Sequence, residues 1–409
     1  MRFTPHLLDE IRARLPVSQV VGRKVNLKRQ GREFVGLSPF KNEKSPSFTV
    51  NDQKGFYHCF ASSEHGDIFT FLMKTEGLAF PEAVERLAEE AGVELPKSLP
   101  PTAEAQAQID THQRLLQLVD SAAEYFNRNL FSRAGQLARD YMSRRGLSDD
   151  TIAEFRLGYA SDDRTALLHH LRKAGFFDRE MIASGMAIGG EDIREPYDRF
   201  RHRVMFPITD LKGRVIAFGG RALDPQQPAK YLNSNDTLLF HKGRVLFNAH
   251  RARQAAFEKS NVIAVEGYMD VIALSQAGFH EAVAPLGTAL TEEQLALLWR
   301  MAPEPILCFD GDSAGRKAAF RAVDTALPHL KPGSSLRFAF LADGLDPDDV
   351  IRESGAKGLQ AVLDKARPLA EVLFDREWGE GDWSTPERRA GLEVRLRNIV
   401  AGIPDQAVR

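Results

Sequence analysis

Acidic residues follow three predicted strands in the second half of the sequence. They are Glu266 after the apolar run 262–265, Asp310 and Asp312 after 306–309, and Asp346, Asp348 and Asp349 after 336–341. The carboxyl ends of parallel strands meet at one sheet edge, where α/β proteins bind ligands, so we expect these carboxylates to converge. Crowded carboxylates repel one another, and divalent cations such as Mg²⁺ neutralise them. The spacing therefore indicates a metal site.

Helix capping is the competing explanation for these acids. A single Asp-x-Asp pair is more often a helix cap, because carboxylates are favoured in the first turn of a helix. Three acidic groups after three strands favour the metal interpretation instead. Gly267 and Gly311 would let the backbone approach a phosphate closely. The chemistry predicted here is two-metal phosphoryl transfer.

Cations set among aromatic residues and glycines precede the acids. The set is Arg199, Arg201, Arg203, Arg221, Lys230 and Lys242. We expect the three alternating arginines at 199–203 to share one face of a strand and to form the wall of a groove. Such a groove suits phosphates and single-stranded bases. A solvated edge strand with surface ion pairs is the alternative.

The elements that must position these residues alternate between strand and helix from residue 261. We expect strands at 262–265, 282–285, 306–309 and 336–341, and helices at 269–276, 291–299, from about 314 and from about 348. This alternation predicts a mostly parallel sheet. Upstream, the apolar runs 204–208 and 215–218 flank a turn at 210–213 and predict a hairpin. The chain after 368 is predicted to be helical.

Composition limits the class of protein. The 409 residues have a net charge of -2 and only two cysteines, Cys59 and Cys308, so no disulfide framework is expected. The sequence has no signal peptide and no apolar span of membrane length, so we expect a cytoplasmic location and no membrane contact. Cations concentrate in 1–54 and 194–253.

Three segments resemble known sequence signatures. Residues 265–270 (Val-Glu-Gly-Tyr-Met-Asp), 309–315 (Phe-Asp-Gly-Asp-Ser-Ala-Gly) and 346–349 (Asp-Pro-Asp-Asp) resemble the pieces of a Toprim domain. Residues 203–208 and 230–234 resemble the amino-terminal half of the RNA-polymerase core of bacterial DnaG-type replicative primases. The resemblance implies metal ligands at Glu266, Asp310, Asp312, Asp346 and Asp348. The resemblance also implies that Glu266, Asp310 and Asp312 are catalytic and that Glu266 handles the proton of the attacking 3′-hydroxyl. Asp270 is expected only to hold the loop.

The same resemblance implies contacts to template or nucleotide phosphates. The residues expected to make them are Arg201, Arg203, Arg221, Lys230 and Lys242. The cofactor expected is Mg²⁺ or Mn²⁺.

Residues 34–73 resemble the zinc ribbon that opens these primases. Ser38, Lys41, Cys59 and Ser62 stand where the family has Cys, His, Cys and Cys. One ligand of four remains, so we expect a zinc-free ribbon held by aromatic packing. Rescue of a zinc site by His58 and His65 is the less favoured alternative. With nearby cations, the module is expected to grip single-stranded DNA.

The fold class predicted is multidomain α/β and α+β. The expected parts are a zinc-ribbon-like β module at 1–96, a linker at 97–109, a mixed α/β basic subdomain at 110–255, a Toprim parallel-sheet domain at 256–366 and the start of a helical subdomain at 367–409. The family continues into a domain that docks the replicative helicase; because this sequence ends before one, helicase docking is not expected.

The function predicted is that of a DNA primase, a monomeric nucleotidyltransferase that uses ribonucleoside triphosphates to prime single-stranded DNA. Another Toprim enzyme, a topoisomerase or a nuclease, is the first alternative. A topoisomerase lacks support because no tyrosine lies in a recognisable DNA-gate setting. A nuclease of this class usually adds an ATPase, and no G-x-x-x-x-G-K-[ST] phosphate loop is present. An inactive DNA-binding scaffold is the second alternative, and it would leave the strand-end acids unexplained.

Overall fold

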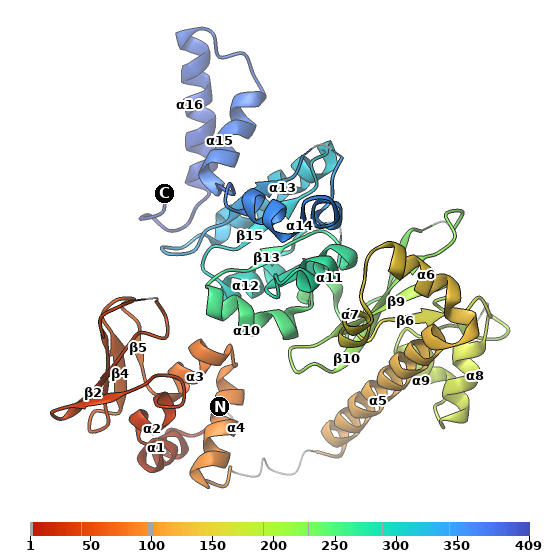
Figure 1. Cartoon of the computed structure of the whole chain (residues 1–409), viewed down its shortest axis with the longest axis horizontal. Coiled ribbons are helices and arrows are strands. Elements are labelled where there is room, and N and C mark those ends of the chain that lie inside the picture. Colours follow the sequence, from red (N-terminus) through yellow and green to blue (C-terminus); the bar gives the residue numbers. More distant parts are fainter. Residues whose placement is uncertain are drawn as a thin grey trace. The chain divides into compact units, whose positions relative to one another are not determined.

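The structure, a computed structural model, describes residues 3–41, 43–95, 102–190, 192–227, 229–287, 289–342 and 344–409. The chain forms two compact units, Met1–Gln106 and Ala107–Arg409 (Figure 1). Helix α5 (Ala103–Phe131) begins inside the predicted linker, so 103–109 are helical, while 96–101 lie outside the described residues. The finer domain boundaries remain predictions.

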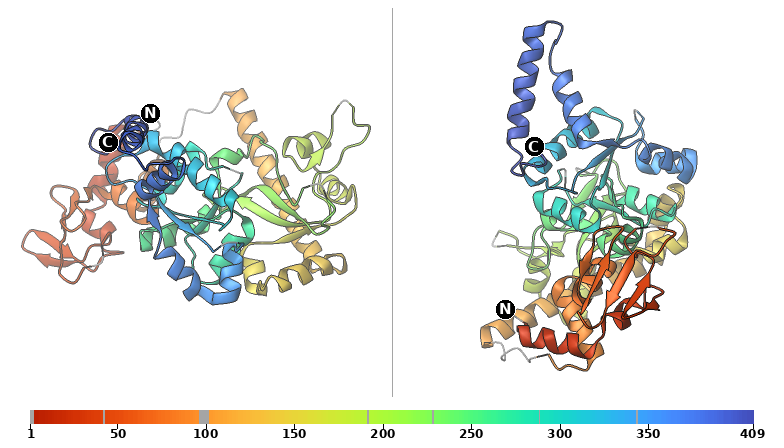
Figure 2. Two further views of the ribbon diagram at one scale, coloured as in Figure 1. Left: turned by 90° about the horizontal axis from the view of Figure 1, so that it is seen from above. Right: turned by 90° about the vertical axis from the view of Figure 1, so that its left-hand side faces the viewer.

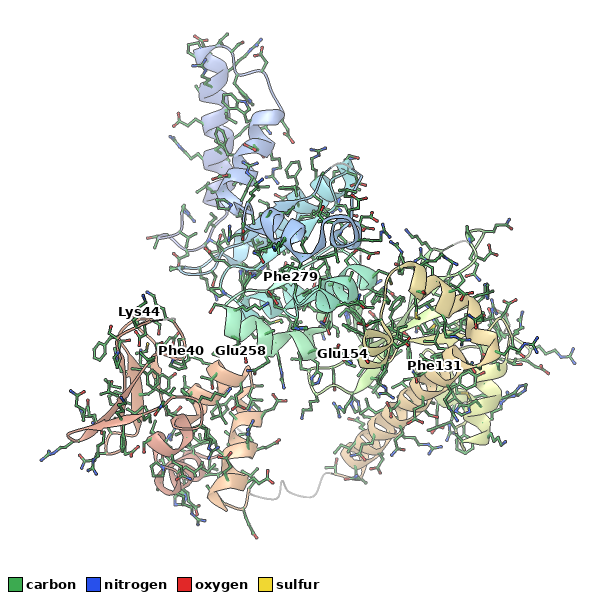
Figure 3. The ribbon with its side chains drawn as sticks, viewed as in Figure 1. Phe40, Lys44, Phe131, Glu154, Glu258 and Phe279 are labelled. Atoms are coloured by element: carbon green, nitrogen blue, oxygen red, sulfur yellow. The ribbon has the colours of Figure 1, made fainter. Side chains whose placement is uncertain are left out.

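The first unit is a small antiparallel sheet packed on four helices. Its strands, in sheet order, are β1 (Lys28–Gln30), β2 (Glu33–Gly36), β3 (Phe48–Asn51), β4 (Phe56–Cys59) and β5 (His65–Gly66). Its helices are α1 (Pro5–Arg14), α2 (Val17–Val21), α3 (Ile68–Glu76) and α4 (Phe80–Ala91). Figure 3 shows the aromatic Phe40 among its side chains. Val84 and Leu87 of α4 are fully buried, because apolar residues recur there at helical spacing.

The second unit begins with helices around a four-stranded antiparallel sheet. The sheet order is β11 (Tyr231–Asn233), β10 (Val215–Ala222), β9 (Arg203–Thr209) and β6 (Gly158–Ala160). The helices are α5, α6 (Gln136–Arg144), α7 (Asp149–Glu154), α8 (Ala166–Lys173) and α9 (Asp178–Ala183), and β7 (Ala187–Ile188) pairs with β8 (Tyr197–Asp198). The predicted hairpin is confirmed as β9–β10, and Asp210 Oδ1 accepts from the Lys212 and Arg214 amides in its turn.

The expectation that Arg199, Arg201 and Arg203 share one strand face is wrong. Strand β9 begins only at Arg203. His202, just before it, has a φ of 51°, a left-handed conformation that interrupts the alternation of an extended chain. The three arginines therefore do not form a flat wall.

A six-stranded sheet forms the centre of the second unit. Its order is β12 (Leu246–Phe247), β14 (Ala282–Pro285), β13 (Ile263–Ala264), β15 (Ile306–Phe309), β16 (Arg337–Phe340) and β17 (Arg367–Pro368). The four inner strands are parallel and the two edge strands antiparallel, which confirms the mostly parallel sheet. The helices that follow the strands are α10 (Ala249–Lys259), α11 (Tyr268–Gln276), α12 (Glu292–Met301), α13 (Ser313–Ala326) and α14 (Pro347–Leu363).

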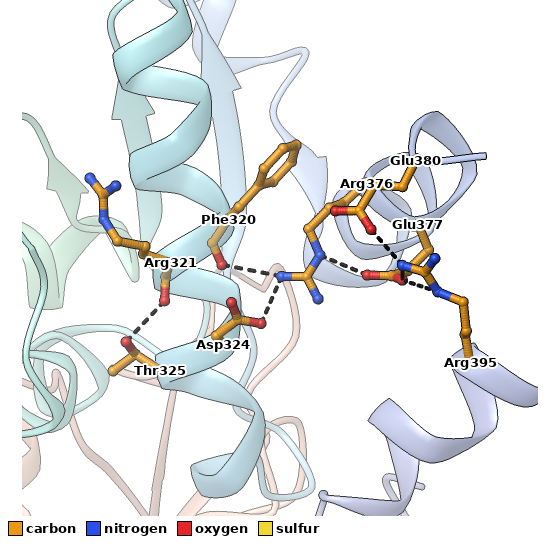
Figure 4. A network of polar contacts seen from close by, with 8 residues as sticks. All are labelled: Phe320, Arg321, Asp324, Thr325, Arg376, Glu377, Glu380 and Arg395. Atoms are coloured by element: carbon orange, nitrogen blue, oxygen red, sulfur yellow. Dashed lines mark hydrogen bonds and ion pairs between the residues drawn. The ribbon is translucent and has the colours of Figure 1, made fainter. Parts of the chain in front are cut away.

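The last two helices, α15 (Leu369–Gly379) and α16 (Pro386–Ala401), lie side by side and project from this sheet (Figures 1 and 2). A polar network ties them together (Figure 4). The buried Glu377 accepts from Arg376 at 2.9 Å and from Arg395 at 2.7 Å, and Arg376 also pairs with Asp324 of α13. In the part of the chain that the structure describes, no helix is both long and apolar enough to span a membrane.

Candidate active site

The predicted acids come together at the carboxyl edge of the parallel sheet. Glu266 follows β13, Asp310 directly follows β15, and Asp346 precedes α14 in the connection from β16. These three strands are neighbours and parallel, so their ends bring the acids to one edge. The Asp310 amide donates to Glu266 Oε1 at 3.3 Å. We call Glu266, Asp270, Asp310, Asp312, Asp346 and Asp348 the acidic cluster.

Asp310 is the residue of the cluster most clearly prepared for a ligand. Its Oδ1 atom is buried and has no hydrogen-bond partner among the described residues. Burial raises the pKa of Asp310 to about 7, and the neighbouring carboxylates of Glu266 and Asp346 contribute to the rise. A buried acceptor without a partner is costly, and a bound cation would remove that cost.

Asp270 lies deeper in the cluster than its motif indicated. It is buried, with 8% of its surface exposed, and its Oδ2 accepts from the Gly267 amide at 2.9 Å. That bond agrees with the expected role in holding the loop. Burial raises its pKa to about 8, with further contributions from Asp346 and Asp310. Asp270 therefore interacts electrostatically with the other carboxylates of the cluster and also holds the loop at Gly267.

Asp312 and Asp346 are helix caps as well as members of the cluster. Asp312 Oδ1 accepts from the Ala314 and Gly315 amides at 2.9 and 2.8 Å, and Asp346 Oδ1 accepts from the Asp349 amide at 2.7 Å. Each cap uses one carboxylate oxygen and not Oδ2. Capping and metal binding, opposed in the sequence, are thus compatible at both positions.

Gly311 sets the close spacing of two connections. A Cβ added at Gly311 would lie 2.1 Å from the Ala342 carbonyl oxygen, a distance that no side chain could tolerate. The turn after β15 therefore packs directly against the chain after β16. This close packing brings Asp310 and Asp312 toward the acids at the start of α14.

Asp348 has a partner that the sequence did not reveal. It is almost fully buried, and its Oδ2 accepts from Arg145 Nη1 at 2.6 Å. Arg145 follows α6, and its Nε donates to the Tyr141 hydroxyl at 3.2 Å. The Tyr141 ring in turn lies 4.2 Å from the Arg221 guanidinium. This chain of contacts joins the basic subdomain to the acidic cluster, and the only local signal was a pair of arginines at a helix end.

Tyr268 makes a second connection between the same parts. Its ring stacks on Phe206 of β9 at 5.0 Å, and its hydroxyl donates to Asn233 Oδ1 of β11 at 2.7 Å. A Cβ at Gly219 would lie 2.4 Å from the Tyr268 Cζ atom, so β10 admits only glycine there. The motif that supplies Glu266 and Asp270 is therefore packed against the basic subdomain. The sequence placed Tyr268 in the motif but did not indicate this role.

The predicted phosphate-binding cations divide into two groups. Arg203 is buried, and its Nη1 donates to the carbonyl oxygens of Gly220 and Ala229 at 3.1 and 2.9 Å. Arg201 lies over the Tyr197 ring, Arg221 is partly exposed, and Lys230 and Lys242 are exposed. Arg203 therefore holds backbone, whereas the other four reach the surface.

A divalent cation fits the acidic cluster by its donor chemistry. As they stand, the described His, Cys, Asp and Glu residues form no group of three arranged around a metal ion. The cluster nevertheless offers only hard oxygen donors, one of them buried without a partner, on carboxylates that raise one another's pKa. Hard divalent cations bind such sites. In the first unit, the family's zinc-ligand positions lie just after β2 and at the end of β4. The residues there are Ser38, Lys41, Cys59 and Ser62, and they offer a single thiol.

Three family models match successive parts of the chain. They describe a CHC2 zinc finger at residues 3–102, the N-terminal domain of a DNA primase catalytic core at 125–253 and a Toprim domain at 260–338. The DNA primase of Escherichia coli K12 is 42% identical over 404 residues, which are 98% of this chain and 69% of that protein. This chain belongs to the family of bacterial DnaG-type primases.

Solved primase structures agree with this membership. A DnaG primase catalytic domain bound to ssDNA has 40% identity and a TM-score of 0.68, covering 73% of this chain and 93% of that one. The Aquifex aeolicus primase, with its zinc-binding and RNA polymerase domains, has 28% identity and a TM-score of 0.62 over 98% of this chain and 93% of that one. DnaG-type primases are DNA-directed RNA polymerases, and a Toprim domain implies the use of divalent metal. The topoisomerase, nuclease and scaffold alternatives are not favoured.

Proposed function

We propose that this primase makes short RNA primers de novo on single-stranded DNA, with Mg²⁺ held by the acidic cluster. The observation that carries the proposal is the buried, unpartnered Oδ1 of Asp310 among carboxylates at the edge of the sheet. The similar DnaG catalytic domain was solved bound to ssDNA, which supports single-stranded DNA as the partner of this chain. Ribonucleoside triphosphates are the substrates that the proposal requires, and a cytoplasmic location remains a prediction.

The reaction we propose is nucleotidyl transfer. Glu266, Asp310, Asp312, Asp346 and Asp348 would hold the cation. When bound, the cation would favour the alkoxide form of the attacking hydroxyl and neutralise phosphate charge. Glu266 accepts the proton of the 3′-hydroxyl, whose oxygen forms a bond to the α-phosphorus. The bond from that phosphorus to the bridging oxygen breaks, and pyrophosphate leaves with the electron pair. Glu266 is exposed, but desolvation by the surrounding protein raises its pKa, as does the neighbouring Asp312, and a raised pKa suits a proton acceptor.

Arg201, Arg221, Lys230 and Lys242 are the residues we propose for template and nucleotide phosphates. Arg221 is placed by the Tyr141 and Tyr231 rings, which lie 4.2 and 5.9 Å from its guanidinium. Its Nε atom is buried without a hydrogen-bond partner among the described residues, and a phosphate oxygen would supply one. Arg203, proposed from the sequence for the same task, is better suited to hold β10 and the chain at 229–230 in place.

The outer face of the ribbon sheet is the surface we propose for the template in the first unit. Phe56 and Phe60 are exposed there by 37% and 68%, and Lys54 lies over the Phe56 ring. The two rings border a hollow of about 280 Å³ that His58 and Thr49 also line. Exposed rings beside a cation can stack single-stranded bases without sequence preference.

Deleting residues 1–102 tests the ribbon's contribution, and a point variant refines the test. Phe56→Ala combined with Phe60→Ala should weaken binding of a fluorescent single-stranded oligonucleotide at least tenfold. Leu37→Ala, at another exposed apolar position of the unit, should leave binding unchanged. Because the second unit also has proposed template contacts, some binding should survive the deletion, but unchanged binding would refute the proposed role of the ribbon.

The first measurement for the whole proposal is incorporation of labelled ribonucleotides on unprimed single-stranded DNA with Mg²⁺. The chain should make short RNA, and Asp310→Ala should make none. Asp364→Ala is the control, because Asp364 borders a cavity at the opposite end of the sheet with Ile263 and Ile306. Equal RNA from the chain and Asp310→Ala would place catalysis elsewhere, and no RNA from either would favour a DNA-binding scaffold.

A further inference from the structure

The family's zinc positions are joined by direct hydrogen bonds in this chain. The Cys59 thiol donates to Ser38 Oγ at 3.1 Å. The Lys41 ammonium group donates to the Ala61 carbonyl oxygen at 3.4 Å, which connects the loop after β2 with the loop after β4. The space between these two loops is therefore bridged by protein groups.

The loop after β2 is closed by side-chain acceptors. Ser38 Oγ accepts from the Phe40 and Lys41 amides, both at 3.0 Å. Glu43 accepts from the Ser38 amide at 2.7 Å, and from the Ser47 amide and hydroxyl at 3.1 and 2.5 Å. These bonds fix a turn by the local mechanism of serine and carboxylate side chains.

The loop after β4 is organised around the Cys59 sulfur. Burial alone would raise the pKa of this thiol, but nearby hydroxyl and amide groups, with the Ser38 hydroxyl first among them, outweigh burial and lower it. Ser38 meets the sulfur from the loop after β2. The buried Ser62 Oγ has no hydrogen-bond partner among the described residues. We call Ser38, Lys41, Glu43 and Cys59 the polar clasp.

The donor set does not fit zinc. A structural zinc site needs four thiolate or imidazole ligands, and lysine donates hydrogen bonds without accepting any. His58 and His65 do not complete the set. They pair across β4 and β5 on the sheet face opposite Cys59, because successive residues of a strand point to opposite faces. Among the described His, Cys, Asp and Glu side chains, no group of three could hold a metal here.

A cluster of buried aromatic rings packs against the loop that carries the clasp. The rings of Phe48 and Tyr57 stack at 5.3 Å, and Phe71 meets Tyr57 edge to face at 5.5 Å. Phe40, from the clasp loop, contacts all three rings at 5.8 to 6.2 Å. Phe48, Tyr57 and Phe71 are almost completely buried. This cluster ties the clasp loop to β3, β4 and α3 through apolar contact.

We infer that the polar clasp replaces the zinc ion of the family, so that this ribbon folds and keeps its shape without metal. The inference concerns the stability of the ribbon and is independent of the proposed primer synthesis. It also implies that the two loops retain the ligand arrangement, so that Ser38→Cys, Lys41→His and Ser62→Cys together restore a zinc site.

Metal content and thermal unfolding of the full chain test the first part. After exposure to Zn²⁺ and gel filtration, mass spectrometry should find no zinc that Cys59→Ser removes, and EDTA should affect the unfolding profiles of the parent chain and Cys59→Ser equally. Zinc held by the acidic cluster would be recognised because Asp310→Ala removes it and Cys59→Ser does not. One zinc per chain that Cys59→Ser removes would overturn the inference.

The triple variant tests the second part with Co²⁺ as the probe. It should bind one Co²⁺ with the thiolate-to-cobalt charge-transfer absorption of a tetrahedral site, and the parent chain should show none. Absence of this absorption from a folded variant would overturn the claim that the loops keep the ligand arrangement. Ser38→Ala should lower the unfolding temperature by about 5 °C, because three donors lose their acceptor. Ser45→Ala, an exposed serine of the same loop, should have no effect; equal effects would contradict the role of the clasp.

Discussion

The Arg145 guanidinium donates to the Asp348 carboxylate at 2.6 Å across 203 positions of sequence. Asp348 is buried beside other acids, and this contact supplies a positive charge that the cluster itself lacks. Burial raises the pKa of Asp348, and Arg145 opposes that rise. The ion pair therefore favours the ionised form of a predicted metal ligand and orients it, and it links the two parts of the polymerase core.

Arg145→Ala should destabilise the second unit by about 3 kcal/mol, because it leaves a buried carboxylate without its partner. Primer synthesis should fall at least tenfold in the same variant. Chemical denaturation and the ribonucleotide assay measure the two effects. Arg144→Ala is the matched control, since Arg144 is the exposed neighbour. A stable and fully active Arg145→Ala variant would show that Asp348 does not need this cation.

Lys230→Ala and Lys242→Ala should each weaken binding of single-stranded DNA with little dependence on sequence. Each lost phosphate contact should reduce the slope of log affinity against log salt by about one. Fluorescence anisotropy over a series of salt concentrations measures the slope. Lys173→Ala, at an exposed position at the end of α8, should leave it unchanged. If all variants had the same slope of log affinity against log salt as the parent chain, the proposed phosphate contacts of both lysines would be contradicted.

Glu377→Gln should lower the stability of the α15–α16 pair by about 2 kcal/mol. The buried carboxylate accepts from two guanidinium groups, and a neutral amide would remove from each its buried charged partner, leaving Arg376 with Asp324 and Arg395 with Glu380 (Figure 4). Limited proteolysis and thermal unfolding should detect loosening of these helices. Glu380→Gln removes an exposed partner of Arg395 and should have little effect. Equal effects of the two changes would contradict the importance of burial.

Asp198 should make stability depend on pH. Its carboxylate is buried and accepts from the Leu167 and Leu168 amides at 2.8 and 2.9 Å, and burial raises its pKa to about 6. Because the folded-state pKa lies above the unfolded value, the stabilisation is complete below about pH 4 and is lost as pH rises through 6. The parent chain should therefore lose up to about 3 kcal/mol of its free energy of unfolding, relative to Asp198→Asn, between pH 4 and pH 7. A difference between the two proteins that does not change with pH would contradict the shift.

The sequence alone determined the parts of this protein that depend on local patterns. Short apolar runs marked β14 and β15 at their observed bounds, and the helix predicted at 291–299 is present as α12, which Thr291 and Gln294 begin with a capping box. The acids follow their strands because a strand and the turn after it are consecutive in sequence. The missing zinc ligands at Ser38, Lys41 and Ser62 were also readable, since residue type alone decides whether a side chain can be a ligand.

Only the tertiary structure decided which distant groups meet. Nothing near Arg145 indicated Asp348 as its partner, and nothing in the motif placed Asp270 inside the cluster. The left-handed conformation of His202 defeated the expected arginine wall, because hydrophobic periodicity carries no information about a single backbone dihedral. The buried position of Arg203 could not be predicted either, because its acceptors are backbone carbonyl oxygens, which every residue type offers. Local chemistry thus supplied the donors of the site, and long-range packing selected their partners.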